Sequence, residues 1–219
     1  MKKAAVVLAG SGVYDGAEIH ESVITLLALD RAGVEVKMFA PDIEQYHVVN
    51  HISGEEMDEK RNVLIESARI ARGKIEDIRN ADMSEFDMVI FPGGFGVAKN
   101  YCNLAFKGKD CEVNPEIEAF IVKAISDKKA LGFICIAPAL LAKVASKVGV
   151  KLSVTIGSDA GTAEVIQSFG SDHVNCPVDE IAIDEKNKIV TVPAYMLGTG
   201  IGEVADGIEK LVTKVIELS

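Results

Sequence analysis

The stretch from Ala130 to Pro138 constrains the possible folds of this chain more than any other. Its first five residues form a short apolar run typical of a buried strand, Cys135 follows, and Pro138 suits the first turn of a helix. The apolar residues beyond the proline have helical spacing: Leu140, Leu141, Val144 and Val148. The chain is therefore predicted to turn sharply from a strand into a helix at Cys135, a geometry known as a nucleophile elbow.

The position of Cys135 is compatible with two roles. As a nucleophile, its side chain would stand out of the turn, with the N–H of Ile136 and the helix N-terminus facing any developing negative charge. The helix end is also expected to lower the pKa of the thiol. Alternatively Cys135 is a core residue, since free cysteines are among the most buried side chains. Its place at the end of the strand favours the nucleophile, but the local pattern leaves both roles open.

Three further apolar segments extend this pattern into an α/β fold. Residues 4–9 form a continuous apolar run, as in a strand buried on both faces, and residues 34–40 and 88–91 give two more strands. A helix over 17–32 joins the first two, so the chain opens with a β-α-β unit. We expect a three-layer, flavodoxin-like α/β sandwich with a mostly parallel central sheet that carries the nucleophile elbow.

The remaining segments complete a single domain over residues 1–219. Residues 181–183 and 189–192 are predicted to form a late β-hairpin across a polar turn. Further helices are expected at 62–72, 115–127, 162–169 and 201–218, and a short strand at 152–156, whereas the polar residues 43–60 are expected to be irregular. No internal repeat or linker divides the chain.

The composition argues against several classes of partner. A formal net charge of −10 and 5% aromatic residues, with no tryptophan, make a nucleic acid or an anionic membrane an unsuitable partner. No apolar run reaches the length of a membrane span, and the first residues lead into a strand rather than a signal peptide. The four cysteines include no C-x-x-C pair, which indicates free thiols in a reducing, cytoplasmic setting.

A glutamate near the start of the first helix is a candidate acid. Glu21 has Ile24 and Ala28 at i+3 and i+7, so it lies beside an apolar stripe. An acid held against apolar surface has a raised pKa and can donate or accept a proton near neutral pH. Alternatively Glu21 only complements the helix dipole. The neighbouring His20 is more simply a solvated or capping residue.

Two glycine-rich loops follow strands and could contact a ligand. Residues 92–96, Pro-Gly-Gly-Phe-Gly, lie at the carboxyl end of a strand, where glycines let backbone N–H groups approach an oxyanion, although the run could be a plain turn. The loop with glycines at 10, 12 and 16 partly matches a dinucleotide fingerprint, but Asp15 stands where the third glycine belongs and Asp42 lies too far along. Nucleotide binding is therefore only an alternative.

Several motifs together resemble one known family over nearly the whole chain. They are G-x-Y-D-G-A-E-I-H-E, P-G-G-F-G-V-A-K-N, G-F-I-C-I-A-P-A, T-I-G-x-D, C-P-V-D-E-I and P-A-Y-M. The chain resembles the ElbB-type branch, called isoprenoid biosynthesis proteins with an amidotransferase-like domain, of the class I glutamine amidotransferase-like superfamily that includes PfpI-type proteases and glyoxalase III. The resemblance implies that Cys135 is the nucleophile and Glu21 the buried acid beside it. It implies oxyanion or substrate binding by Gly93, Gly94, Ile136 and Asn100.

The sequence also departs from that superfamily where a histidine is usual. PfpI-type proteins have a histidine directly after the nucleophile, where this chain has Ile136, and the downstream His-x-Glu of amidotransferases is absent. His20 and His173 are the conceivable auxiliary residues. His173 and Cys176 are spaced like half of a metal site, but no second pair of ligands follows, so no metal is expected.

These features lead to two competing functions. As an enzyme, the chain would be a cofactor-free glyoxalase that converts small α-oxoaldehydes such as methylglyoxal and glyoxal to hydroxy acids, with Cys135 as nucleophile and Glu21 as proton carrier. As a non-enzyme, it would be a redox or metabolic regulator that uses the reactive cysteine. We expect no protease or glutaminase activity, because amide cleavage needs a general acid that the missing histidine would supply. A small carbonyl substrate and a homodimer are the expected partners.

Overall fold

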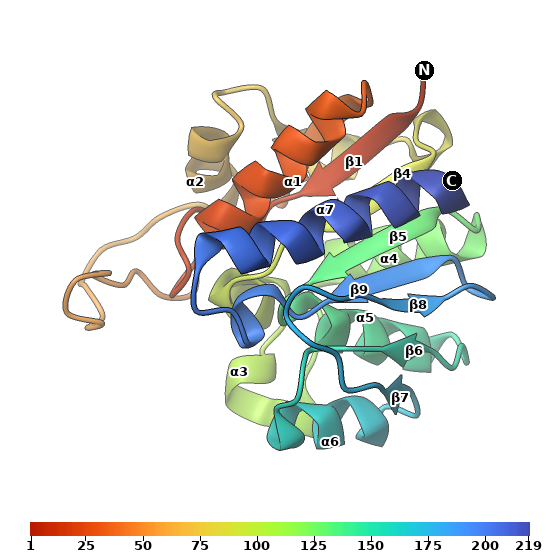
Figure 1. Cartoon of the computed structure of the whole chain (residues 1–219). Coiled ribbons are helices and arrows are strands. Elements are labelled where there is room, and N and C mark those ends of the chain that lie inside the picture. The colour runs from red at the N-terminus through yellow and green to blue at the C-terminus, as the bar shows by residue number, and fades with distance from the viewer.

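The computed structural model describes all residues from 1 to 219 and contains a seven-stranded sheet (Figure 1). The strand order is β3-β2-β1-β4-β5-β9-β8, and only β8 runs antiparallel to its neighbour. The strands are β1 (Lys3–Val7), β2 (Glu35–Ala40), β3 (Glu76–Asp77), β4 (Met88–Phe91), β5 (Ala130–Ile134), β8 (Ala182–Asp184) and β9 (Ile189–Val192). This confirms the predicted mostly parallel sheet and its late hairpin, β8–β9.

Helices cover both faces of this sheet. The helices are α1 (Ile19–Arg31), α2 (Val63–Ile70), α3 (Leu104–Lys107), α4 (Pro115–Ser126), α5 (Ala137–Lys147), α6 (Ala160–Ser168) and α7 (Ile201–Leu218). Figure 1 shows α1 and α7 side by side in front of the sheet and α4 and α5 behind it, so three layers result. No helix is both long enough and apolar enough to cross a bilayer.

The core explains why the central strands could be located from their sequence. All residues of β4 and β5 are buried, as the continuous apolar runs require for strands covered on both faces. Phe91 and Phe133 are register partners on these strands, and their rings stack with centroids 4.7 Å apart. At Gly132 an added Cβ would lie 2.9 Å from the side chain of Leu211, so the glycine lets α7 pack closely on β5. This packing fixes the strand ends that carry the site.

Several elements differ from the sequence-based expectation. The strand expected at 152–156 is reduced to β6 (Ser153–Val154), which pairs with β7 (Asp172–His173) in a separate two-stranded sheet. Helix α1 begins at Ile19 rather than Ala17, because the carboxylate of Glu18 caps it. Residues 97–101, for which we expected no element, form a one-turn π-helix, η3 (Val97–Tyr101), and four short 3₁₀ turns also occur: η1 (Ile78–Asn80), η2 (Met83–Glu85), η4 (Gly108–Asp110) and η5 (Ala194–Met196).

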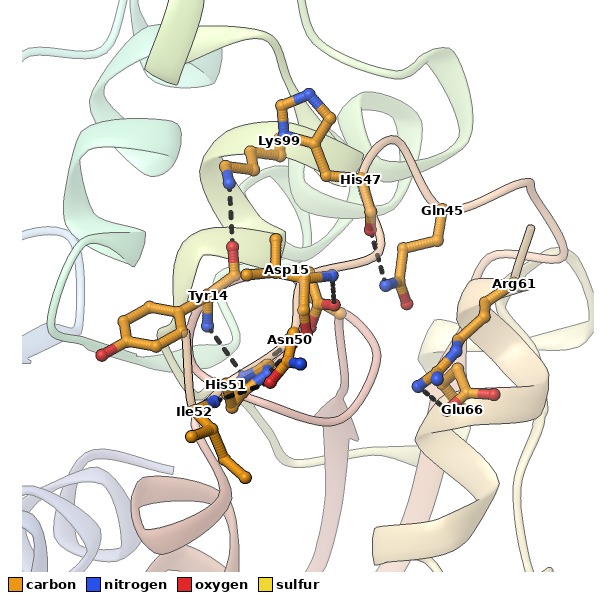
Figure 2. A network of polar contacts seen from close by, with 12 residues as sticks. Tyr14, Asp15, Gln45, His47, Asn50, His51, Ile52, Arg61, Glu66 and Lys99 are labelled. Carbon is orange, nitrogen blue, oxygen red and sulfur yellow. Dashed lines mark hydrogen bonds and ion pairs between the residues drawn. The ribbon is translucent and has the colours of Figure 1, made fainter. Parts of the chain in front are cut away.

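The irregular segment 43–62, which we call the strap, lies against the glycine loop 10–16 (Figure 2). Asp15 is buried and its carboxylate accepts the N–H of Val49 at 2.7 Å. The Nε2 atom of His51 accepts the N–H of Tyr14 at 3.2 Å. An added Cβ at Gly12, where φ is 130°, would lie only 2.6 Å from that imidazole. The strap therefore covers the loop that partly matched a dinucleotide fingerprint.

Candidate active site

Cys135 lies at the sharp turn between β5 and α5, as the sequence predicts. Its φ is 62°, in the left-handed region that a non-glycine residue rarely adopts, and Ile136 directly afterwards is the N-cap of α5. The N–H of Cys135 donates to the carbonyl of Val192 at 2.9 Å, so the turn is anchored to the end of β9. Backbone strain that neighbouring strands hold in place is typical of functional turns. The residue is only 8% exposed.

Glu21 is completely buried and lies beside this cysteine. One carboxyl oxygen, Oε2, accepts the N–H of Gly93 at 2.9 Å, and the other, Oε1, accepts the N–H of Tyr195 at 3.3 Å. The side chain also hydrogen-bonds to Cys135. Burial, followed by the charge of Glu18, raises the pKa of Glu21 to about 8, against the effect of the two backbone donors. Glu21 is therefore mostly protonated at neutral pH, which agrees with the expectation of an acid with a raised pKa.

The thiol of Cys135 does not have the lowered pKa that its helix N-terminus led us to expect. Burial is the main cause that raises the pKa of this thiol, and an ionised Glu21 adds to it. The N–H groups of Gly94 and Ile136 face the sulfur and act in the opposite direction. The expectation is wrong for the resting site because desolvation of a thiolate outweighs two amides and a helix end. The hydrogen bond with Glu21 also raises the pKa of the thiol, because it holds the proton on the sulfur.

The two glycines after β4 have different roles. Gly93 donates its N–H to Glu21 and accepts the N–H of Glu18 on its carbonyl, so it positions the acid. An added Cβ at Gly93 would lie 2.5 Å from the Cβ of Cys135. Gly94 has φ 98°, and it directs its own N–H toward the sulfur. The N–H groups of Gly94 and Ile136 thus both face the sulfur, whereas the N–H of Gly93 is already bonded to the Glu21 carboxyl.

The side chain of Asn100, for which the resemblance implied substrate binding, hydrogen-bonds to backbone groups of neighbouring segments. Its side-chain nitrogen donates to the carbonyls of Ala9 and Asp15, both at 3.0 Å, and its oxygen accepts the N–H of Tyr46 at 2.9 Å. All three partners are backbone groups of the glycine loop and the strap. Asn100 is therefore a structural residue that ties η3 to these two segments.

The two candidate histidines are separated in the structure. The Nδ1 atom of exposed His20 lies 2.7 Å from the hydroxyl of Tyr195, whose backbone holds Glu21, so His20 reaches the outer edge of the site. His173 lies in β7, where its Nε2 accepts the N–H of Ile156 at 3.3 Å, and no hydrogen bond joins it to Cys135 or Glu21. Burial lowers the pKa of His173. His20 stays a candidate auxiliary residue, and His173 is part of the small sheet.

Tyr195 and Glu18 are site residues that sequence reasoning missed. Tyr195 follows the end of β9, which is the neighbour of β5, and Glu18 both caps α1 and contacts the peptide of Gly93. In the sequence, the P-A-Y-M motif is the only indication of a role for Tyr195. The position of Glu18 near the start of a helix is the only indication that it acts as a cap. The roles of both residues depend on contacts between segments that are distant in the sequence.

One surface hollow, of about 650 Å³, lies away from this site; it is formed by η1, η2 and the outer face of α4, with Met83 and Phe120 in its lining. Because Cys135 is 8% exposed, direct access to its sulfur is limited to small molecules.

Comparisons with known proteins give relatives that match almost the whole chain, although no protein-family model matches. A human protein named glutamine amidotransferase-like class 1 domain-containing protein 3, mitochondrial, is 47% identical over 227 residues, which cover 99% of this chain and 83% of that protein. The zebrafish ES1 protein, mitochondrial, is 32% identical and covers 98% of this chain and 85% of its own length.

Solved structures extend this similarity to the fold. An isoprenoid biosynthesis protein with an amidotransferase-like domain from Ehrlichia chaffeensis superimposes with a TM-score of 0.94 at 39% identity, covering 100% of this chain and 99% of that chain. A DJ-1 superfamily protein from Salmonella typhimurium has a TM-score of 0.60 at 22% identity, covering 99% of this chain and 91% of that one. At that identity the likeness concerns the fold alone.

Proposed function

Because the chain belongs to the glutamine amidotransferase-like class 1 family that includes the ES1 proteins, we propose that it is a cofactor-free glyoxalase. Its substrates would be small α-oxoaldehydes such as methylglyoxal and glyoxal, and its products the corresponding hydroxy acids. Family membership confirms the resemblance of the sequence to the ElbB-type branch, but the proposal of this reaction rests on the site itself.

The observation that carries the proposal is the pairing of Cys135 with a protonated, buried acid. Glu21 has no lysine or arginine partner, its pKa is raised to about 8, and it hydrogen-bonds to the thiol. A carboxyl group with this pKa can donate a proton and take one back near neutral pH. The N–H groups of Gly94 and Ile136 complete the site with a cradle for a negatively charged oxygen.

The reaction can be written with these groups and one water molecule. The reacting form is the fraction of protein in which Glu21 is ionised, which a pKa of about 8 allows near neutral pH. As the sulfur of Cys135 bonds to the aldehyde carbon, Glu21 takes the thiol proton and passes it to the aldehyde oxygen, which lies in the amide cradle. Glu21, again a carboxylate, takes the hydrogen from that carbon as a proton and returns it to the neighbouring carbon, while the hydroxyl proton moves to the neighbouring carbonyl oxygen through an enediol. The result is a thioester of the hydroxy acid on Cys135. Water hydrolyses this thioester, releasing the acid and restoring the thiol.

The absence of a histidine beside Cys135 supports an aldehyde rather than an amide substrate. An amide needs a general acid for its leaving nitrogen, whereas the internal rearrangement of an α-oxoaldehyde has no leaving group until the thioester stage. The narrow access to the sulfur also suits a substrate of two or three carbons.

The absence of a histidine beside Cys135 leaves one alternative, a non-catalytic regulator that responds to oxidation of this thiol. Nucleotide binding is less well supported, since the strap covers the glycine loop. We also propose a reducing compartment for the chain because its four cysteines are unpaired. The cytoplasmic location stays a prediction, and the human and zebrafish relatives are named as mitochondrial.

The test is lactate formation from methylglyoxal by purified protein without glutathione, metal or nucleotide. We expect activity that Cys135→Ala abolishes and that Cys176→Ala, a change at another buried free cysteine, leaves intact. If the wild-type protein makes no lactate above the Cys135→Ala background, the glyoxalase proposal fails and the regulator takes its place.

A further inference from the structure

His51 of the strap uses both nitrogens of its ring in hydrogen bonds to backbone groups. Nδ1 lies 3.0 Å from the carbonyl oxygen of Val49, which can only accept, so Nδ1 carries a hydrogen. Nε2 lies 3.2 Å from the N–H of Tyr14, which can only donate, so Nε2 carries none (Figure 2). The two contacts together therefore select the neutral imidazole with its hydrogen on Nδ1.

A buried carboxylate lies where it can bind the other charge state of this ring. Oδ1 of Asp15 is 3.8 Å from Nε2 of His51, and Asp15 is only 3% exposed. The other carboxylate oxygen, Oδ2, already accepts the N–H of Val49. A proton on Nε2 turns this nitrogen into a donor, which can no longer accept the N–H of Tyr14 but can donate to Asp15. The ring thus has one partner for each of its charge states.

Several charged or ionisable side chains surround this ring. They come from three segments: Tyr14 and Asp15 of the glycine loop, Lys99 of η3, and Glu56 and Arg61 of the strap. The ammonium of Lys99 donates to the carbonyl of Tyr14 at 2.9 Å. The charges of Lys99 and Arg61 both interact with that of Asp15. Asp15 is the group within ion-pair distance of Nε2, so a proton on the ring has an anion as its nearest charged partner.

The glycine loop that this ring contacts is bonded to the loop that contains Gly94. Before the contact, the carbonyl of Val13 accepts the N–H of Phe95 at 2.8 Å. After the contact, the carbonyl of Gly16 accepts the N–H of Gly96 at 2.9 Å. A Cβ at Gly94 would have no room against the same carbonyl of Gly16. The glycine loop therefore fixes the position of Gly94.

We propose that His51 is a positioning residue that acts as a pH-sensitive switch on the amide cradle of Cys135. While neutral, it accepts the N–H of Tyr14 and holds the glycine loop, and with it Gly94, in the observed position. Protonation of Nε2 removes this acceptor, and the imidazolium binds the carboxylate of Asp15 instead. The N–H of Tyr14 is then released, and the N–H of Gly94 is less firmly directed toward the sulfur. The switch acts on the cradle that the proposed function uses, but its test needs no turnover.

Backbone amide NMR of the full chain between pH 5 and 8 tests this switch, because an imidazole changes its charge in this range. We expect the N–H signals of Tyr14 and Gly94 to shift together as the pH falls. His51→Gln should abolish this shared change, since an amide oxygen can accept the N–H of Tyr14 at every pH. Glu21, whose pKa is raised to about 8, and the imidazole of His20 also titrate near Gly94, so only the part of the change that the variant removes counts.

Hydrogen exchange gives the size of the effect. The protection factor of the Tyr14 amide, which corrects for the intrinsic pH dependence of exchange, should be about twofold to tenfold lower at pH 5 than at pH 7.5, as the loss of one hydrogen bond predicts. In Asp15→Asn the change should move to lower pH, because the imidazolium loses its countercharge while an amide oxygen can still accept the N–H of Val49. His47→Gln is the matched control: His47 also lies in the strap, with its Nε2 3.8 Å from Glu56, and its loss should leave the response intact.

The outcomes that contradict the proposal are distinct. A response at Tyr14 that persists in His51→Gln, that does not reach Gly94 or that disappears in His47→Gln would overturn it. If His51→Gln does not fold, an unchanged pH response in Asp15→Asn would overturn it equally. A protein that forms no lactate but shows the shared response would lose the proposed function and retain the switch. A protein that forms lactate without the shared response would retain the function and lose the switch.

Discussion

Tyr195 contacts the candidate site through both its backbone and its side chain. Its N–H holds the buried carboxyl of Glu21, and its hydroxyl lies 2.7 Å from the Nδ1 of exposed His20. The preceding Ala194 has φ 45°, so the chain turns back directly after β9 and brings Tyr195 beside the end of β5. The Tyr195 hydroxyl and the exposed His20 imidazole together connect the outer edge of the candidate site with solvent.

Tyr195→Phe should lower kcat for lactate formation about tenfold or more, with KM nearly unchanged, because a proton-exchanging group is lost while the backbone contact to Glu21 remains. The rate of Cys135 alkylation should stay the same, since Phe removes no charge. Steady-state kinetics across pH 6 to 9 provide the measurement, with Tyr46→Phe, a change at an exposed tyrosine of the strap, as control. An unchanged kcat in Tyr195→Phe would show that the pair takes no part in the reaction.

The π-helix η3 is bonded to both the glycine loop and the strap. Asn100, at the fourth position of η3, joins Ala9, Asp15 and Tyr46 through buried hydrogen bonds. Single π turns are frequent near functional sites because they redirect a side chain within a helix. Here the side chain of Asn100 holds two loops together.

Asn100→Ala should therefore destabilise the chain by about 1–3 kcal/mol, because it leaves buried backbone groups without partners. The loss should be local: hydrogen exchange followed by mass spectrometry should accelerate in residues 43–62 while β5 stays protected. Asn103→Ala, which removes an exposed bond to the N–H of Glu112, is the matched control and should have a smaller effect. An increase in KM without any loss of stability would instead restore the substrate-binding role.

At the scale of the whole molecule, the sequence was sufficient for the parts of the fold that depend on burial alone. Residues 88–91 and 130–134 are apolar throughout because helices cover both faces of the sheet, and their bounds match β4 and β5. The sharp turn at Cys135 and the raised pKa of Glu21 followed from the local sequence pattern and from the apolar stripe of α1. Local sequence patterns thus located both principal residues, Cys135 and Glu21.

The features that could not be predicted depend on contacts between distant polar segments. The cap by Glu18 and the contact of Tyr195 with Glu21 require β4, β9 and α1 to be adjacent already. The direction of the Cys135 pKa was wrong because a local pattern records the helix end but not the depth of burial. Asn100 has no pattern of its own, since its role comes from backbone groups about 50 to 90 residues away in the sequence.

The burial of Glu21 also links the stability of the whole chain to pH. In the unfolded chain this carboxyl loses its proton near its ordinary pKa of 4.5, whereas in the folded chain it keeps the proton up to about pH 8. Between these values the unfolded state binds fewer protons, so the free energy of unfolding falls as pH rises, by at most about 1.4 kcal/mol per pH unit. This contribution is fully present below pH 4.5 and is lost by about pH 8.

Glu21→Gln removes this titration and should change the pH dependence of stability in a defined direction. Measured by thermal or urea unfolding, the difference in stability, variant minus wild type, should rise steadily from pH 5 to pH 8 and become flat beyond it. The fixed cost of placing an amide against the N–H groups of Gly93 and Tyr195 shifts the whole difference curve but not its slope. The lowered pKa of His173 acts equally in both proteins and cancels, while the raised pKa of Cys135 affects stability mainly above pH 9. Parallel stability curves for the two proteins would mean that Glu21 is already ionised in the folded chain at pH 5, and the acid assigned to the reaction would then be the wrong one.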